Sequence, residues 1–412
     1  MIKRNDIRSK LIGLMRPMRP MRPMRPIGPM RLIRLMSLIG LMGLGLMGCS
    51  EDERDDRRWQ SVELVPYYKA VSEEVAAERR VSAPSGYYAY PGTGVYPQAS
   101  TTHASIQVFM TQGNKVETQG AFQWKEDKWV SSVKFPYNEE GNESQNTFYV
   151  YGFMPSNATA TSSSGIIRPR AVENQTDDYK NGAVITLTNV PVITPADVCM
   201  IVGASDEASV SSGTIDVGSF RFIGQDAYAG GQNKLLLLLN HIYSSINFTF
   251  DTDKDYYKLR RIKLKEVQMK CAGQQKMNLT VTITPNQANP VTVSGDFLGE
   301  ATEGTYVDLD IADKTKVIPS NNSGTVYNVP GFFTPMVEQT GGATTFTLRC
   351  TYDVYDAKGN LVRPDCSAEN KITIAQTFYE GTSYTVPLTI EPTYLYQLSE
   401  FDLDNPTIKV GS

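Results

Sequence analysis

The sequence predicts an all-β protein built from two tandem sandwich domains. Two observations carry this prediction. Short segments that alternate apolar and polar residues recur along most of the chain, and Gly, Pro, Asn and Asp separate them. The hydrophobic content is 41%, with 22 Tyr and 15 Phe, which is enough to fill large cores and excludes a disordered chain.

The alternating segments give the expected strands in chain order. They include Ser105–Met110, Val184–Thr188, Ile246–Phe250, Leu279–Thr284, Thr345–Val354 and Tyr384–Ile390. Their short, regular spacing favours antiparallel sandwiches over alternating strands and helices. A glycine-rich break at residues 224–232 marks the expected boundary between an N-terminal domain of residues 81–230 and a C-terminal domain of residues 231–412.

Two hairpins are predicted from their turn residues. Trp124 and Trp129 lie symmetrically about a charged turn, where they can either stack across the hairpin or form a platform for a sugar ligand. The second hairpin, Asp353–Leu361, reads as a strand, a Gly-Asn turn and a return strand. Cys350 and Cys366 lie symmetrically about its centre, so they could form a disulfide. The alternative is that the cysteines are buried thiols that pack as small apolar side chains.

The first 48 residues differ in composition from the rest. They carry ten basic side chains and one acidic one, which leaves 30 basic and 43 acidic groups in residues 49–412. The apolar run of residues 35–47 is too short to span a bilayer but suits a signal peptide behind a basic segment. The run ends in Gly48-Cys49-Ser50, which resembles a bacterial lipobox. We therefore expect residues 1–48 to be a lipoprotein signal peptide and Cys49 to carry the lipid.

Residues 49–80 read as a tether and a short pro-segment. An acidic run follows Cys49 directly, and Trp59–Tyr68 alternates as a strand. Lys69–Arg80 is rich in helix formers and is predicted to be a helix.

Enzymes and nucleic-acid binders are disfavoured by what the sequence contains. No phosphate-binding loop, nucleophile elbow or zinc-protease motif occurs, and a net charge of −13 after residue 48 does not suit a phosphate backbone. Of the two histidines, His103 lies in an expected loop, and His241 lies in an apolar run and is expected to be structural. Asp251–Asp255 begins like a calcium loop but lacks the later glycine and glutamate, so a polar turn is expected. We expect no catalytic residue, metal or cofactor.

Four segments, in order, resemble the fimbrillins of Bacteroidetes, which build type V pili. They are Thr147–Pro155, Pro195–Ala204, Leu237–Phe248 and Gly381–Pro406. His241 matches the histidine of the third family motif, whereas Asn240 departs from that motif. The resemblance implies two transthyretin-like Greek-key β-sandwich domains, a lipoprotein precursor at the outer membrane, and a structural, non-enzymatic role in a surface fimbrium.

The resemblance also implies how such a subunit would assemble. An arginine-specific protease would cut between Arg80 and Val81 and remove the first strand, and a strand from another subunit would enter the vacated groove. The alternative is that Arg79-Arg80 is an ordinary basic pair at a helix end. The implied partners are other pilin subunits, the outer membrane through the lipid of the precursor, and a host or bacterial surface target.

The C-terminus is the candidate donor strand. Its alternating apolar residues are Tyr394, Tyr396, Leu398, Ile408 and Val410. These strands could instead close the second sandwich within one chain. The sequence thus predicts a stalk or tip pilin, with a non-polymerising surface lipoprotein or glycan-binding adhesin, or a pilus anchor subunit, as alternatives.

Overall fold

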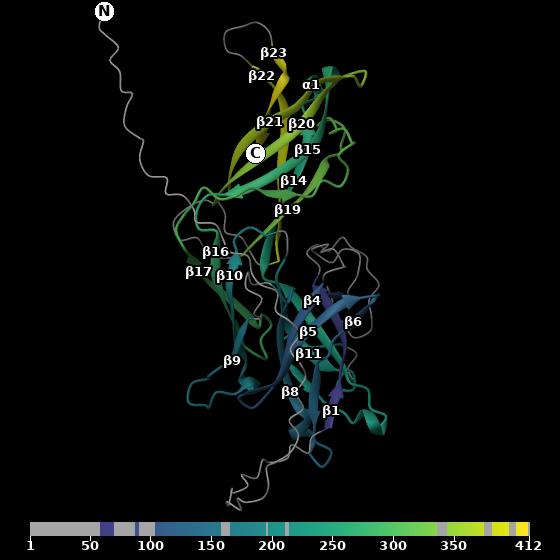
Figure 1. The fold of residues 1–412 in the computed structure, drawn as a ribbon, viewed down its shortest axis with the longest axis vertical. Coiled ribbons are helices and arrows are strands. Elements are labelled where there is room, and N and C mark those ends of the chain that lie inside the picture. The colour runs from purple at the N-terminus through teal and green to yellow at the C-terminus, as the bar shows by residue number, and fades with distance from the viewer. Residues whose placement is uncertain are drawn as a thin grey trace, which may run out of the picture. The chain divides into compact units, whose positions relative to one another are not determined.

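The computed structural model describes residues 58–69, 87–89, 104–157, 165–194, 197–210, 214–335, 344–374, 381–394 and 401–410. Almost all the elements within these ranges are β-strands (Figure 1), which confirms the predicted fold class. The single α-helix of the described residues is α1 (Lys254–Leu259), and three 3-10 turns are η2 (Glu143–Asn146), η3 (Tyr179–Asn181) and η4 (Ala227–Ala229).

Two sheets share the first hydrophobic core. The larger sheet has the spatial order β3 (Tyr87–Ala89), β2 (Glu63–Lys69), β13 (Lys234–His241), β11 (Cys199–Asp206), β8 (Thr147–Met154), β4 (Ser105–Gln112), β5 (Lys115–Lys125) and β6 (Lys128–Val130), and β12 (Arg221–Ile223) pairs with β8. The second sheet has the order β17 (Val291–Leu298), β16 (Lys276–Ile283), β10 (Ala183–Pro191) and β9 (Ile166–Pro169). β1 (Arg58–Ser61) and β7 (Lys134–Tyr137) form a separate antiparallel pair.

Two further sheets share the second core. One has the order β19 (Tyr327–Pro335), β14 (Tyr243–Thr252), β22 (Ser383–Tyr394) and β23 (Phe401–Val410). The other has the order β18 (Val307–Leu309), β15 (Arg260–Cys271), β20 (Thr344–Asp356) and β21 (Leu361–Ile374). Side chains from both sheets, such as Phe248 of β14 and Leu348 of β20, belong to one buried cluster. The six strands predicted from alternation correspond to β4, β10, β14, β16, β20 and β22, and only Thr284 of the predicted residues lies beyond its strand.

The division of the chain between the two cores does not fall at the predicted boundary near residue 230. The leucines of β13 lie in the first core, and so do Met277, Leu279 and Ile283 of β16. Figure 1 shows the green β16 and β17 beside the teal β9 and β10, although β14 and β15 of the second core come between them in sequence. The second core therefore begins with β14, and the β16–β17 hairpin returns to the first.

The strand β13 explains a run of five leucines that does not alternate. Leu235–Leu239 are all nearly fully buried, because this strand lies inside the larger sheet between β2 and β11 with both faces covered. Strands buried on both faces read as continuous apolar runs.

Both predicted hairpins form, but the predicted disulfide does not. The turn between β5 and β6 has positive φ at Glu126 and Asp127, as a tight hairpin turn requires. In the β20–β21 hairpin, two register shifts place Cys350 opposite Ala368, and Cys366 lies opposite Tyr352. Cys350 is a free, buried thiol, so the symmetry of the sequence about the turn was misleading.

The predicted polar turn at Asp251–Asp255 is instead the junction between the end of β14 and the start of α1. The Asp253 carboxylate accepts hydrogen bonds from the Asp255 and Tyr256 amides, at 2.9 and 3.0 Å. Asp253 is therefore the N-cap of α1, and Tyr256 is buried in the second core.

Candidate functional site

The strand β2 is the part of residues 49–80 that lies inside the first sandwich. It pairs in parallel with β13, from Glu63 opposite Lys234 to Tyr68 opposite Leu239, and antiparallel with β3. Leu64, Tyr67 and Tyr68 are buried in the first core, each at most 4% exposed. The predicted strand Trp59–Tyr68 thus corresponds to β1 and β2, whereas Lys69, predicted to open a helix, ends β2.

Contacts beyond the backbone ladder hold each end of β2. At its start, the Glu63 amide donates to the Asn233 carbonyl at 2.9 Å, and the Asn233 side chain is itself bound to Gln225. At its end, the Lys69 carbonyl accepts a hydrogen bond from Nε2 of His241 at 2.8 Å. The last residues paired in the ladder are Tyr68 and Leu239. The imidazole therefore extends the connection between β2 and β13 past the point where their backbone pairing stops.

His241 belongs to a buried cluster with Asp197 and Cys199. Nδ1 of the imidazole lies 2.5 Å from Oδ2 of Asp197, and the Cys199 thiol donates to the same oxygen at 3.1 Å. Cys199 lies opposite His241 in the β11–β13 ladder. Asp197 and His241 are 4% exposed and Cys199 is 2% exposed. The three side chains come from chain positions up to 44 residues apart and meet because β11 and β13 are neighbours.

Burial and the carboxylate act in opposite directions on the cluster. Burial disfavours the charged imidazole, but the charge and hydrogen bond of Asp197, together with the Lys69 carbonyl, raise the pKa of His241 above 6.5. Burial, then the charge and hydrogen bond of Asp197, raise the pKa of Cys199 well above its usual value, so the thiol stays protonated. The surroundings of the imidazole thus favour its protonated form beside Asp197, with a neutral thiol next to them.

The same cluster contains three atoms of the kinds that bind metal ions. The ligand atoms of Asp197, Cys199 and His241 lie within 4.8 Å of one another. However, Nδ1 and Oδ2 are only 2.5 Å apart. Two ligands on a tetrahedral zinc with bonds of about 2.0 Å lie roughly 3.3 Å apart. The geometry is that of a direct hydrogen bond, and we assign no metal role to these residues.

Two more side-chain hydrogen bonds involve β2 or the strands on either side of it. The Tyr87 phenol of β3 donates to the side-chain carbonyl of Asn240, next to His241 in β13. Burial outweighs this hydrogen bond and raises the pKa of Tyr87 to about 12. Tyr68 of β2 donates to the sulfur of Met154 in β8 at 2.6 Å. The strand position between β13 and β3, which β2 occupies, is thus lined by polar groups as well as by apolar ones.

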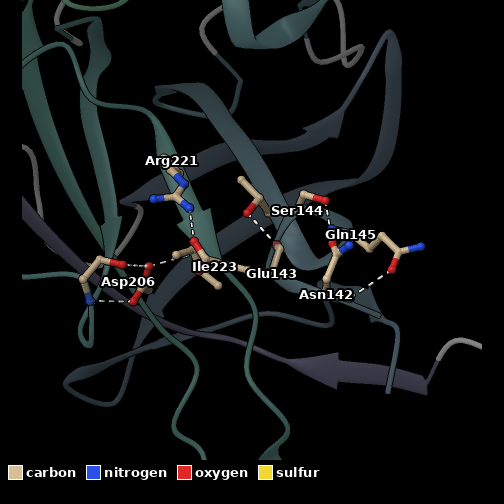
Figure 2. A network of polar contacts seen from close by, with 9 residues as sticks. Asn142, Glu143, Ser144, Gln145, Asp206, Arg221 and Ile223 are labelled. Carbon is tan, nitrogen blue, oxygen red and sulfur yellow. Dashed lines mark hydrogen bonds and ion pairs between the residues drawn. The ribbon is translucent and has the colours of Figure 1, made fainter. Parts of the chain in front are cut away.

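A separate polar network fixes loops at another part of the first sandwich (Figure 2). Asn142 caps η2 through a reciprocal pair of hydrogen bonds with Gln145, and Arg221 forms an ion pair with Glu143. Asp206, 2% exposed, accepts hydrogen bonds from the Ser209 and Ile223 amides at 2.8 and 3.1 Å. These contacts join η2 and β11 to β12 and are structural.

The structure places only some of the site residues predicted from sequence. Cys49, Arg80, Val81, Tyr396 and Leu398 lie outside the described residues. Tyr394 ends β22, while Ile408 and Val410 lie in β23, which pairs antiparallel with β22. Ile408 is buried in the second core at 4% exposure. In this structure the candidate donor strand closes the second sandwich of its own chain.

Trp124 and Trp129 face each other across the β5–β6 hairpin. Their ring centroids are 5.4 Å apart, the rings meet edge to face, and both side chains pack against the first core. Such pairs stabilise a hairpin. This geometry favours the stacking interpretation over a flat platform for a sugar.

The sequence pattern predicted no role for Asp197, although this residue lies in the fimbrillin-like segment Pro195–Ala204. The available signal was an isolated acid at the start of an apolar strand, in a chain with only two histidines. Asp197 binds His241, which lies 44 residues away in sequence, so their contact depends on the strand order of the sheet.

Comparisons with known proteins give similar structures but no similar sequences. No family model and no curated protein matches the chain. A putative cell adhesion protein from Bacteroides ovatus has a TM-score of 0.38 and 12% identity, with 86% of this chain and 97% of that chain covered. A fimbrial protein from Bacteroides vulgatus has a TM-score of 0.37 and 9% identity, with 86% and 98% covered. The fimbrial anchor protein Mfa2 from Porphyromonas gingivalis has a TM-score of 0.31 and 9% identity, with 86% and 97% covered.

TM-scores of this size are too low to assign a fold or a function. Both are therefore inferred from the strands and cores of this chain. Within its described part, no helix has the length and apolarity needed to cross a bilayer.

Proposed function

We propose that this protein is a structural, non-enzymatic subunit of a cell-surface fimbrium, which polymerises by strand exchange after its N-terminal segment is removed. The observation that carries the proposal is the position of β2. This strand lies between β13 and β3, yet it belongs to the segment that ends at Arg80. A single cut between Arg80 and Val81 would separate β2 from every later strand of the sheet.

Loss of β2 would leave an unstable surface that another strand can fill. Leu64, Tyr67 and Tyr68 would leave the core. The backbone groups of β13 and β3 that pair with β2 would lose their hydrogen-bond partners. An unpaired strand edge beside an open apolar groove is a template for β-strand addition, in which backbone hydrogen bonds give affinity and alternate side chains give register. The filling strand, in this proposal, comes from another copy of the chain.

The remaining parts of the proposal follow from the N-terminal sequence. The precursor is exported as a lipoprotein with its lipid on Cys49, reaches the surface of the outer membrane, and is freed from that anchor by the cut after Arg80. The mature chain, residues 81–412, carries 24 basic and 34 acidic groups and no lipid. The resemblance to fimbrillins, with their motifs in the same order, supports this course of events.

The proposal is tested by the double substitution Arg79→Ala/Arg80→Ala in the producing cell. We expect the variant to accumulate as a lipidated precursor with a blocked N-terminus, and the unchanged protein to begin at Val81. Mass spectrometry of the N-terminal peptide and detergent-resistant ladders on a gel measure the two consequences. A matched control is Arg57→Ala/Arg58→Ala, another adjacent arginine pair in the same segment. Ladders formed by the Arg79/Arg80 variant as readily as by the unchanged protein would contradict the proposal.

A further inference from the structure

The two ring nitrogens of His241 face acceptors on opposite sides. Nε2 lies 2.8 Å from the Lys69 carbonyl, which can only accept, so Nε2 must carry a proton. Nδ1 shares a second proton with Oδ2 of Asp197 at 2.5 Å. The imidazole therefore connects a buried carboxylate to the main chain of β2, and its two protons are both needed for that connection.

The described titratable groups near the ring do not replace these partners. The titratable groups around the ring, from the elements packed against it, are Asp197, Cys199, Lys69 and Tyr243. The Cys199 thiol is bound to Asp197, and the charge of Lys69 opposes protonation of the ring. Burial, followed by the charge of Asp197, raises the pKa of Tyr243, so this phenol stays neutral. Gly381, which has no side chain, also packs against His241.

We infer that His241, oriented by Asp197, is the register-setting anchor of the strand position between β13 and β3. The anchor binds the main-chain carbonyl at the end of the strand in that position. In the intact chain the carbonyl is that of Lys69. After strand exchange it belongs to the strand of a second copy, which is the part that rests on the proposed function.

The anchor adds a constraint that the backbone ladder lacks. The ladder between β2 and β13 ends at Tyr68, and a strand displaced by one residue would turn its buried side chains to the other face. A side-chain donor fixed by a buried carboxylate can donate to a carbonyl at one position only. If the strand is absent or displaced, Nε2 is left as a buried donor with no acceptor, which is costly. The pairing is therefore strongest when the strand ends opposite His241.

Amide hydrogen exchange of the full chain tests the anchor before any cleavage. In His241→Phe, which keeps a ring of similar size, we expect amides in residues 63–69 to exchange about tenfold faster or more, as loss of a charged hydrogen bond predicts. Amides of β15 and β20 in the second core should not change. The matched control is His103→Phe, the only other histidine of the sequence. Unchanged exchange of residues 63–69 in His241→Phe would overturn the anchor.

A measurement on the unsubstituted chain covers the case in which His241→Phe does not fold. Nitrogen-15 NMR of the side chains, assigned with His103→Phe, should show both ring nitrogens of His241 protonated at pH 6 and the Nε2 proton protected from solvent. An unprotonated Nε2, or a rapidly exchanging proton there, would overturn the inference.

The anchor hypothesis and the proposed function can be rejected independently of each other. Ladders from the cleaved protein, together with unchanged exchange of residues 63–69 in His241→Phe, would leave the function standing and reject the anchor. Faster exchange in that variant, with no ladders from correctly cleaved protein, would keep the anchor as a property of the intact chain and reject strand exchange.

Discussion

At the scale of single residues, His241 shows how burial and charge compete. Removal from water is the largest effect on this side chain and by itself favours the neutral ring. The Asp197 carboxylate and the Lys69 carbonyl together outweigh it, so the pKa of the folded state exceeds 6.5. A group whose pKa is raised by folding stabilises the folded state fully below its unfolded pKa. That contribution is lost as the pH rises through the folded pKa.

The chain should therefore lose stability as the pH rises from the pKa of an unfolded histidine, about 6.5, through the higher folded-state pKa of His241, because His241 loses its proton. We expect the free energy of unfolding of the first core to fall by roughly 1.5–3 kcal/mol over that range, the net worth of a hydrogen bond to a charged group. Urea titrations followed by tryptophan fluorescence measure it, since Trp124 and Trp129 both pack against this core. Most carboxylates titrate below this range, and Cys199 titrates above it.

The variant Asp197→Asn gives the control for this pH dependence. Its amide can donate to Nδ1 of a neutral ring, which leaves Nε2–H bound to the Lys69 carbonyl without a net proton uptake. The slope of stability against pH should then flatten while the exchange of residues 63–69 stays slow. A slope equal to that of the unchanged chain would mean that another group titrates.

The sequence allowed part of this site to be predicted. His241 was expected to be structural because it follows an apolar run, and its buried hydrogen bonds agree with that. The role of Asp197 was not predictable, because Lys69, Asp197 and His241 meet only once β2, β11 and β13 are neighbours. The predicted Cys350–Cys366 disulfide was wrong for a related reason, since bulges shift the register of the hairpin and sequence symmetry does not show bulges.

At the scale of elements, alternation predicts strands but not their partners. The segment Leu279–Thr284 was correctly predicted to be a strand, and nothing in its pattern shows that β16 pairs with β10 of the first sandwich. Which distant strands pair depends on how the side chains of complete sheets pack against each other. The helix α1 was missed because its six residues are too few for a helical period, while its N-cap Asp253 also suits a turn.

The strand β23 gives a prediction at this scale. Truncation of residues 401–412 should abolish ladder formation by cleaved protein, if β23 is the donor. The second core should survive, because β23 is an edge strand and contributes the buried Ile408, whose loss costs about 1.5–3 kcal/mol. Gels and thermal melting measure the two effects.

The control for this truncation is Lys409→Ala. This exposed side chain forms an ion pair with Glu391, so its removal should change neither result by much. Ladders from the truncated chain would show that the donor lies elsewhere in the sequence.

At the scale of the whole molecule, the two cores are interleaved along the chain. The first core uses strands up to β13, and then, after β14 and β15, the hairpin β16–β17. The second core uses β14, β15 and the strands from β18 onward, although Tyr243 of β14 and Phe333 of β19 lie in the first core. A composition break near residue 230 indicated a loop correctly, but a loop is not a domain boundary when the next strand lies in the same sheet.

This interleaving predicts that a fragment ending at the sequence break will not fold. Residues 58–230 lack β13, with five nearly fully buried leucines, and lack β16 and β17, which pair with β10 and with each other. The fragment would expose β2 and β11 on either side of a missing central strand. We therefore expect no cooperative thermal transition and no dispersed amide spectrum for it. The matched fragment 58–412 keeps both cores and should melt cooperatively. A cooperative transition of residues 58–230 alone would mean that the first sandwich is stable without the strands that the second half of the chain supplies.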